Sequence, residues 1–183
     1  MTVRWVSTFV VVILLAGCAG RDDGARLIAP GEGGAAGIIY PDVPVGQPYV
    51  VGDLIVCLDR PGSAVIDRVE SIEPTGDLTI TDFGVIPNEM ERGGMGFSDE
   101  YLHTPISQLP QPYPVDVVDG ACADHASVAL LLEYRRPGGD QSAGNKGIVI
   151  HYTSDGDRRE ASVNWQILLC APGDSTTPDC ANP

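Results

Sequence analysis

The chain has 183 residues, of which 43% are hydrophobic and 20% charged, a composition typical of a globular rather than a disordered protein. It carries 25 acidic residues against 11 Lys and Arg, so its formal net charge at pH 7 is -14. Such an acidic surface repels phosphate groups, which argues against nucleic acid as a partner and against adsorption to an anionic leaflet.

The first 18 residues combine a basic residue, an apolar run and a short motif. Arg4 precedes the apolar residues 9–15, and the run closes with Leu15-Ala16-Gly17-Cys18. An apolar core of about ten residues is too short to span a bilayer as a stable helix, which takes about 20. The segment is therefore suited to engaging the secretion machinery and then being removed.

This segment resembles the signal peptide and lipobox of bacterial lipoprotein precursors. The resemblance covers residues 1–18 alone. It implies a signal peptide at residues 1–17, cleavage before Cys18 and diacylation of the Cys18 thiol. The mature protein would be lipid-anchored at the extracytoplasmic face of the cell membrane, with the lipid bilayer as a partner through the acylated Cys18. An uncleaved anchor helix, or an ordinary signal peptide with a chance cysteine, is the alternative.

Residues 18–46 are expected to form a flexible tether after the lipidated cysteine. Seven glycines and three prolines lie in this segment, and no apolar period is sustained. As a random coil it would span about 30 Å and lift a domain clear of the headgroups. Ile38, Ile39 and Tyr40 interrupt it, and they either dock on the domain or are isolated apolar residues. Residues 47–183 are then expected to form a single domain.

Beyond residue 46 the apolar residues alternate with polar ones in short runs bounded by Pro, Gly, Asp and Asn, as in strands. Leu78 and Ile80 have the opposite parity from Phe83 and Val85, so a bulge near Asp82 is needed to bring both pairs to the core. The expected strands cover residues 49–58, 64–72, 78–86, 115–118 and 127–135, with a last hairpin that turns at residues 155–156.

In that last hairpin Ile148, Ile150 and Tyr152 are expected to point inward, and Trp165 is expected in the core on the return strand. A helical period is almost absent from the chain. We therefore expect an all-β fold, an immunoglobulin-like antiparallel β-sandwich of about seven strands stabilised by disulfides, with an open barrel as the alternative.

Four cysteines remain beside Cys18, an even number that predicts two disulfides in an exported chain: Cys57, Cys122, Cys170 and Cys180. Four cysteines allow three pairings, and the sequence does not choose among them. The turn-rich loop between the last two favours their pairing, which would leave the first two to pair. A zinc site is the alternative, although the wide spacing lacks the usual paired cysteines.

The motifs of the common hydrolases and of phosphate-binding loops are absent, so we expect a protein that is not an enzyme and uses no cofactor. His103, His125 and His151 would each need a serine brought close by the fold to act as a base. His151 has the outward parity of its strand and is expected at the surface. The pairs Arg135-Arg136 and Arg158-Arg159 are expected to keep strand ends soluble and to pair with carboxylates.

Residues 87–114 are expected to form a long irregular connection, of the kind that often carries function. Met90 and Met95 flank the Gly93-Gly94 bend there, and His103 follows in the same loop. Two thioethers and an imidazole suit copper(I), whereas the plainer interpretation is that the methionines fill gaps under the loop.

The sequence thus predicts a membrane-anchored extracytoplasmic lipoprotein that acts as a non-enzymatic binding module and whose partner is a protein of the cell envelope. A copper carrier that uses Met90, Met95 and His103 is the alternative.

Overall fold

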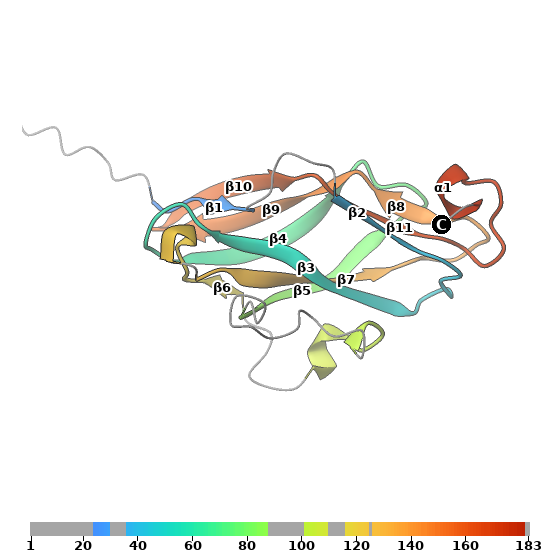
Figure 1. The fold of residues 1–183 in the computed structure, drawn as a ribbon, viewed down its shortest axis with the longest axis horizontal. Helices are drawn as coiled ribbons and strands as arrows, with labels where there is room; N and C mark the ends of the chain where they lie inside the picture. The colour runs from blue at the N-terminus through green and yellow to red at the C-terminus, as the bar shows by residue number, and fades with distance from the viewer. Residues whose placement is uncertain (1–23, 30–35, 88–100, 110–115, 125, 182–183) are drawn as a thin grey trace, which may run out of the picture.

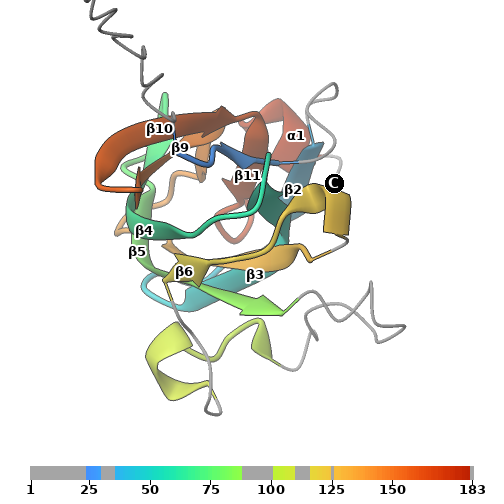
Figure 2. The same cartoon turned by 90° about the vertical axis from the view of Figure 1, so that its left-hand side faces the viewer.

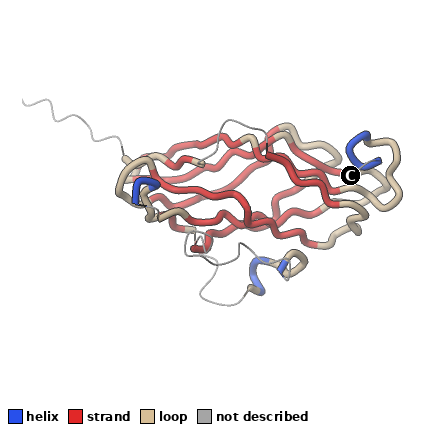
Figure 3. Tube along the Cα trace, in the orientation of Figure 1, coloured by secondary structure: helices blue, strands red, loops and turns tan. Residues whose placement is uncertain are grey.

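The computed structural model describes residues 24–29, 36–87, 101–109, 116–124 and 126–181. Strands dominate these residues, and the helices are single short turns (Figure 3). The elements are β1 (Leu27–Ile28), β2 (Ala36–Tyr40), β3 (Pro48–Leu58), β4 (Ala64–Ile72), β5 (Thr79–Pro87), the 3-10 turn η2 (Ile106–Gln108), β6 (Val117–Val118), the 3-10 turn η3 (Cys122–Asp124), β7 (Val128–Arg135), β8 (Ala143–Asn145), β9 (Gly147–Ser154), β10 (Asp157–Val163), β11 (Trp165–Leu169) and α1 (Pro178–Ala181).

The strands form two four-stranded sheets, in the orders β1-β3-β7-β5 and β10-β9-β4-β6, and a three-stranded sheet in the order β2-β11-β8. Every pairing between these strands is antiparallel except that of β2 with β11. Figure 1 shows β4, β9 and β10 on one side of the molecule and β3, β5 and β7 on the other, and the turned view of Figure 2 shows β3 below β4, β9 and β10. The expected all-β, disulfide-stabilised sandwich is confirmed, with short strands added to the long ones.

The core lies between the sheets, where alternate side chains of facing strands meet. Leu130, Leu132 and Tyr134 of β7 are each at most 1% exposed, and Ile148 and Ile150 of β9 are fully buried. They belong to one apolar cluster, which also includes Trp165. Full burial of one such aliphatic side chain contributes about 1.5–3 kcal/mol. The period-two pattern read from the sequence therefore identifies the core correctly.

The bulge expected in β5 is present. The register of β5 against β7 shifts between Ile80 and Asp82. Leu78 and Val85 are buried on either side of the shift, and Ile80 and Phe83 pack against the same core cluster. One extra residue in the strand thus brings two pairs of opposite parity to one face.

The last hairpin turns as expected but its return strand divides. Asp155 and Gly156 both have positive φ, as a two-residue hairpin turn requires. The return strand β10 pairs with β9 as far as Val163. After Asn164 the chain continues as β11, which pairs instead with β8 and β2. The return strand that the sequence pattern predicts as one continuous strand is therefore divided into two strands that belong to two different sheets.

The segment expected to be a flexible tether belongs largely to the domain. β1 pairs with β3, and β2 pairs in parallel with β11. Ala25, Leu27 and Val43 are at most 4% exposed, and Ile38 and Tyr40 pack against the core. The prediction of a tether over residues 18–46 is therefore wrong for the described residues of that range, because apolar side chains in a Gly- and Pro-rich segment find partners on the sandwich.

Two disulfides close the domain with the favoured pairing. Cys57 of β3 bonds Cys122 of η3 across 65 residues, and Cys170 bonds Cys180 of α1 across 10 residues. All four thiols are consumed, so the zinc alternative for these cysteines is wrong.

A second apolar cluster covers the outer face of β7, where Ile106 and Leu109 pack on Val50 and Leu131. Glu133 holds the segment that contains Ile106 in place on this face. Its side chain is 4% exposed and accepts hydrogen bonds from the Ile106 N–H at 3.0 Å and the Thr81 hydroxyl at 2.8 Å, together with an ion pair from Arg135 at 2.8 Å. Part of the 87–114 connection is thus held against the sheet.

Burial alone would raise the pKa of Glu133, but the hydrogen bonds from Ile106, Arg135 and Thr81 outweigh it and hold the pKa below the usual value of a glutamate. A lowered pKa adds stability above the unfolded-state value, which is about 4.3, and that stability is lost as the pH falls through the folded-state value. We therefore expect the stability advantage of the native protein over Glu133→Gln to be constant near pH 7 and to shrink below about pH 4. Urea unfolding at several pH values measures it, and an advantage that grows on acidification would contradict the assignment.

The Arg135-Arg136 pair is not simply a soluble strand end. Arg135 pairs with Glu133 as expected, but Arg136 is 2% exposed. Its guanidinium donates to the carbonyl of Val43 at 3.0 Å and to those of Gly139 at 2.6 Å and Gln141 at 3.1 Å. Arg136 therefore joins the segment before β3 to the loop after β7, and the expectation of an exposed residue is wrong.

Candidate binding groove

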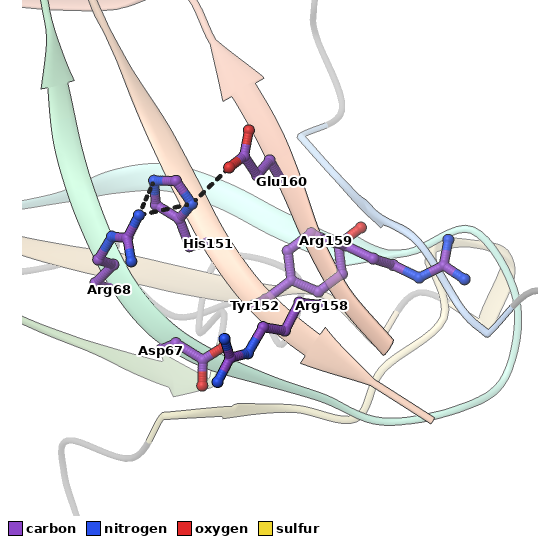
Figure 4. A pocket seen from close by; sticks show the side chains of 7 residues that line it. All are labelled: Asp67, Arg68, His151, Tyr152, Arg158, Arg159 and Glu160. Carbon is purple, nitrogen blue, oxygen red and sulfur yellow. Dashed lines mark hydrogen bonds and ion pairs between the residues drawn. The ribbon is translucent and has the colours of Figure 1, made fainter. Parts of the chain in front are cut away.

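A polar groove lies on the outer face of β4, β9 and β10 and encloses about 670 Å³. Charged side chains of both signs surround it (Figure 4). The residues that line it are Asp67, Arg68, His151, Tyr152, Arg158, Arg159 and Glu160.

Strand register brings these residues together. β9 lies between β4 and β10, and His151 stands opposite Arg68 on one side and Glu160 on the other. The register of β4 shifts between Ile66 and Arg68, so both Asp67 and Arg68 are exposed on the outer face. The bulge thus adds one extra charged side chain to the groove.

His151 lies between two carboxylates at the centre of this face. Its Nε2 is 2.9 Å from a carboxylate oxygen of Glu70, and its Nδ1 is 3.0 Å from one of Glu160. The Arg68 guanidinium lies 3.4 Å from both ring nitrogens and also pairs with Glu70. His151 has the expected outward orientation, but these neighbours leave its side chain only 13% exposed.

The hydrogen bond from His151, with the nearby positive charge of Arg68, holds the pKa of Glu70 below its usual value. Both ring nitrogens of His151 are engaged by carboxylates, so neither is placed to take a proton from a substrate. Among the seven lining residues the one hydroxyl, that of Tyr152, accepts a hydrogen bond from the Leu27 N–H at 3.1 Å. The arrangement is suited to holding charges in place rather than to nucleophilic catalysis.

Two arginines of the groove keep unused donors. Arg158 is exposed and makes no hydrogen bond or ion pair within the described part of the chain. Arg159 is 17% exposed, with its Nη2 4.0 Å from Asp157 and its buried Nε without an acceptor among the described residues. The expectation that both would pair with carboxylates is therefore wrong for Arg158. From the sequence, Arg158 and Arg159 stand out only as two cations in an acidic chain, and nothing in it predicts a groove around them.

A second hollow, near the end of β11, contrasts with the groove because its one carboxylate, that of Asp174, is already satisfied by neighbouring hydroxyls. Asp174 accepts hydrogen bonds from the hydroxyls of Ser142, Thr176 and Thr177 and from the Thr176 N–H. The hydrogen bond from Ser142, followed by those from the two threonines, holds the pKa of Asp174 well below its usual value. This network ties the chain after β11 to the residue before β8 and occupies the Asp174 carboxylate.

The remaining candidate residues are not brought together by the described structure. His103 is exposed, stacks edge-on against Tyr49 with ring centroids 4.7 Å apart, and has its Nδ1 3.4 Å from the Pro48 carbonyl. Met90, Met95, His125 and Cys18 lie outside the described residues, so the copper site and the lipid anchor remain predictions. Within the described ranges, no group of three or more His, Cys, Asp or Glu is placed to hold a metal ion. No helix there is long and apolar enough to cross a membrane.

The fold and the groove define a disulfide-closed all-β domain with a charged outer face. No known protein family and no curated protein matches the sequence. A solved structure of the VesB protease from Vibrio cholerae is similar at a TM-score of 0.37 and 4% sequence identity, over 81% of this chain and 32% of that one. The chain thus spans about a third of that protein's length, and a likeness of this degree carries no argument about function.

Proposed function

We propose that the protein is a lipid-anchored, non-enzymatic binding module at the extracytoplasmic face of the cell membrane, which holds a protein partner of the cell envelope. The lipobox and the two disulfides support export, because structural disulfides form and persist in oxidising compartments. The binding role rests on one observation, the Arg158 guanidinium that lies in a groove without a partner of its own.

Replacement of the lipidation site tests the anchor. Cys18→Ala is expected to abolish membrane retention, because no thiol remains to be acylated and each buried methylene of an acyl chain contributes about 0.8 kcal/mol to binding. Fractionation of cells that express the native and variant proteins measures the loss, with cleavage of the N-terminus followed by mass spectrometry. Full retention of an uncleaved variant would show that an anchor helix, and not a lipid, holds the protein.

The chemistry of the groove favours a partner that presents a carboxylate. A guanidinium matches a carboxylate through two parallel hydrogen bonds, which gives both strength and geometric selectivity. The Arg68, Glu70, His151 and Glu160 side chains already pair with one another, so the charges they present would set the orientation of an incoming charged segment. Binding is then expected to weaken at high salt.

Loss of the free guanidinium tests the groove. A photoreactive residue at Ser162, which has the same strand parity as Arg158 and Glu160, would capture a partner seated on this face in intact cells. We expect Arg158→Gln to lower the affinity about 30-fold or more and to remove the adduct, since losing one member of a buried charge pair costs roughly 2–5 kcal/mol. Mass spectrometry of the captured protein reads the result.

Lys146→Gln is the matched control, because it removes the same charge from a cation that pairs with Glu73 away from the groove. The adduct should persist in this variant. Equal adducts in Arg158→Gln and Lys146→Gln would show that the partner binds elsewhere, and adducts lost in both would show that net charge alone governs the association.

A further inference from the structure

The described chain begins between two turns at one end of the sandwich. Gly24 packs against Asp155 of the β9–β10 turn, where an added Cβ would lie 2.7 Å from the Asp155 carboxylate. An added Cβ on Gly62, in the β3–β4 turn, would lie 2.8 Å from the Cβ of Ala25. Asp59 fixes the same place by accepting a hydrogen bond from the Arg26 N–H at 2.8 Å. In Figure 1 this end of the long axis lies opposite α1.

The length of chain before Gly24 limits how far this end can lie from an acylated Cys18. Six residue steps separate Cys18 from Gly24. They span about 20 Å when fully extended and about 13 Å as a random coil. The tether of about 30 Å expected from the sequence is thus much shortened, because the chain already packs on the sandwich at Gly24 and Ala25.

The far end of the sandwich lies well beyond that reach. β3 has 11 residues and runs from Pro48, paired with Arg135, to Leu58, paired with Leu27 beside the chain entry. A strand of this length covers about 36 Å. The two ends of the domain are therefore separated by more than the tether can span.

We infer that the short tether, and not electrostatic attraction, holds the end formed by the β3–β4 and β9–β10 turns beside the phospholipid headgroups, with the Cys170–Cys180 end directed away from the bilayer. The inference rests on the proposed lipidation of Cys18. Residues 59–63 and 155–157 at this end are exposed and, apart from Pro61, lack apolar side chains, so they suit the polar headgroup layer and not the acyl interior. Arg158 follows directly in β10, and a partner bound in the groove would therefore meet the module close to the membrane surface.

Photo-crosslinking to lipid tests the orientation. A photoreactive residue is placed at position 60 or 157 at this end, or at position 140 in the loop after β7, in the full-length lipidated protein on vesicles of phosphatidylethanolamine and phosphatidylglycerol. Lipid adducts are expected from positions 60 and 157 and none above background from position 140. Two positions at the near end guard against one variant failing to fold, which intact disulfides and the circular dichroism spectrum monitor.

A longer tether is the matched control. Insertion of 20 Gly and Ser residues between Gly20 and Arg21 should remove the adducts from positions 60 and 157 while the protein stays on the vesicles. Equal adducts at positions 60 and 140, or adducts at neither position on a retained protein, would overturn the orientation and leave the anchor intact. Adducts at positions 60 and 157 that survive the insertion would also overturn it, because the tether would not be their cause. Loss of the native protein from the vesicles would instead overturn the proposed function.

Discussion

Removal of the Cys57–Cys122 disulfide is expected to lower the free energy of unfolding by about 4 kcal/mol, because a cross-link over a loop of this length strongly restricts the unfolded chain. Removal of the Cys170–Cys180 disulfide should cost only about 3 kcal/mol, because it closes a loop of 10 residues. Alanine is the replacement of choice for both pairs, since Cys57 is 1% exposed and Cys170 3%. Urea unfolding followed by circular dichroism measures the two losses.

Each double variant serves as the control for the other, because both remove two cysteines and neither leaves an unpaired thiol. The larger loss should fall on Cys57→Ala/Cys122→Ala. The opposite order would show that contacts in the folded state outweigh chain entropy at one of these sites. Reduction of the native protein should destabilise it at least as much as the worse of the two variants.

Local patterns were enough to predict the long strands of this fold. The side chains that their period of two assigns to the inner faces of β7 and β9 are buried, although β7 is also covered on its outer face, and the shift at Asp82 follows from a change of parity within one strand. The favoured disulfide pairing also rests on a local feature, the turn-rich loop between Cys170 and Cys180. Such features act over a few residues, so one sequence is sufficient to read them.

The docking of residues 24–29 and 36–46 was beyond local patterns. β2 joins the sheet through parallel pairing with β11, a strand about 130 residues later in the chain. Parallel pairs are joined by long connections and leave no turn signal between them. A segment rich in Gly and Pro therefore reads as a linker, although Val43 in it is fully buried.

The groove was missed for the same reason. His151 meets Glu70 and Glu160 only because β9 lies between β4 and β10 in a given register. Outward parity predicts that a histidine faces the solvent side of a sheet, but not which side chains flank it there. The period of each strand is visible in the sequence, whereas the pairing of charges across three strands is a property of the assembled sheet.

Replacement of Arg136 by Met is expected to cost about 3 kcal/mol of stability, because a buried guanidinium that serves three carbonyls is lost and each buried polar group left unsatisfied costs about 1–3 kcal/mol. The Met side chain keeps much of the apolar volume of the arginine. The loss of stability therefore reflects the missing hydrogen bonds more than an empty cavity. Urea unfolding monitored by the fluorescence of Trp165 measures it.

Arg158→Met is the control for this change, since Arg158 is exposed and pairs with no described residue, and it should stay within about 0.5 kcal/mol of the native protein. Arg136→Lys should recover part of the loss, because an ammonium can reach one carbonyl but lacks the planar fork that serves several. Equal stability of Arg136→Met and Arg158→Met would show that the carbonyls released by Arg136 form hydrogen bonds with water instead, without loss of stability. A selective loss in Arg136→Met would instead show that this arginine fastens the residues just before β3 to the loop after β7.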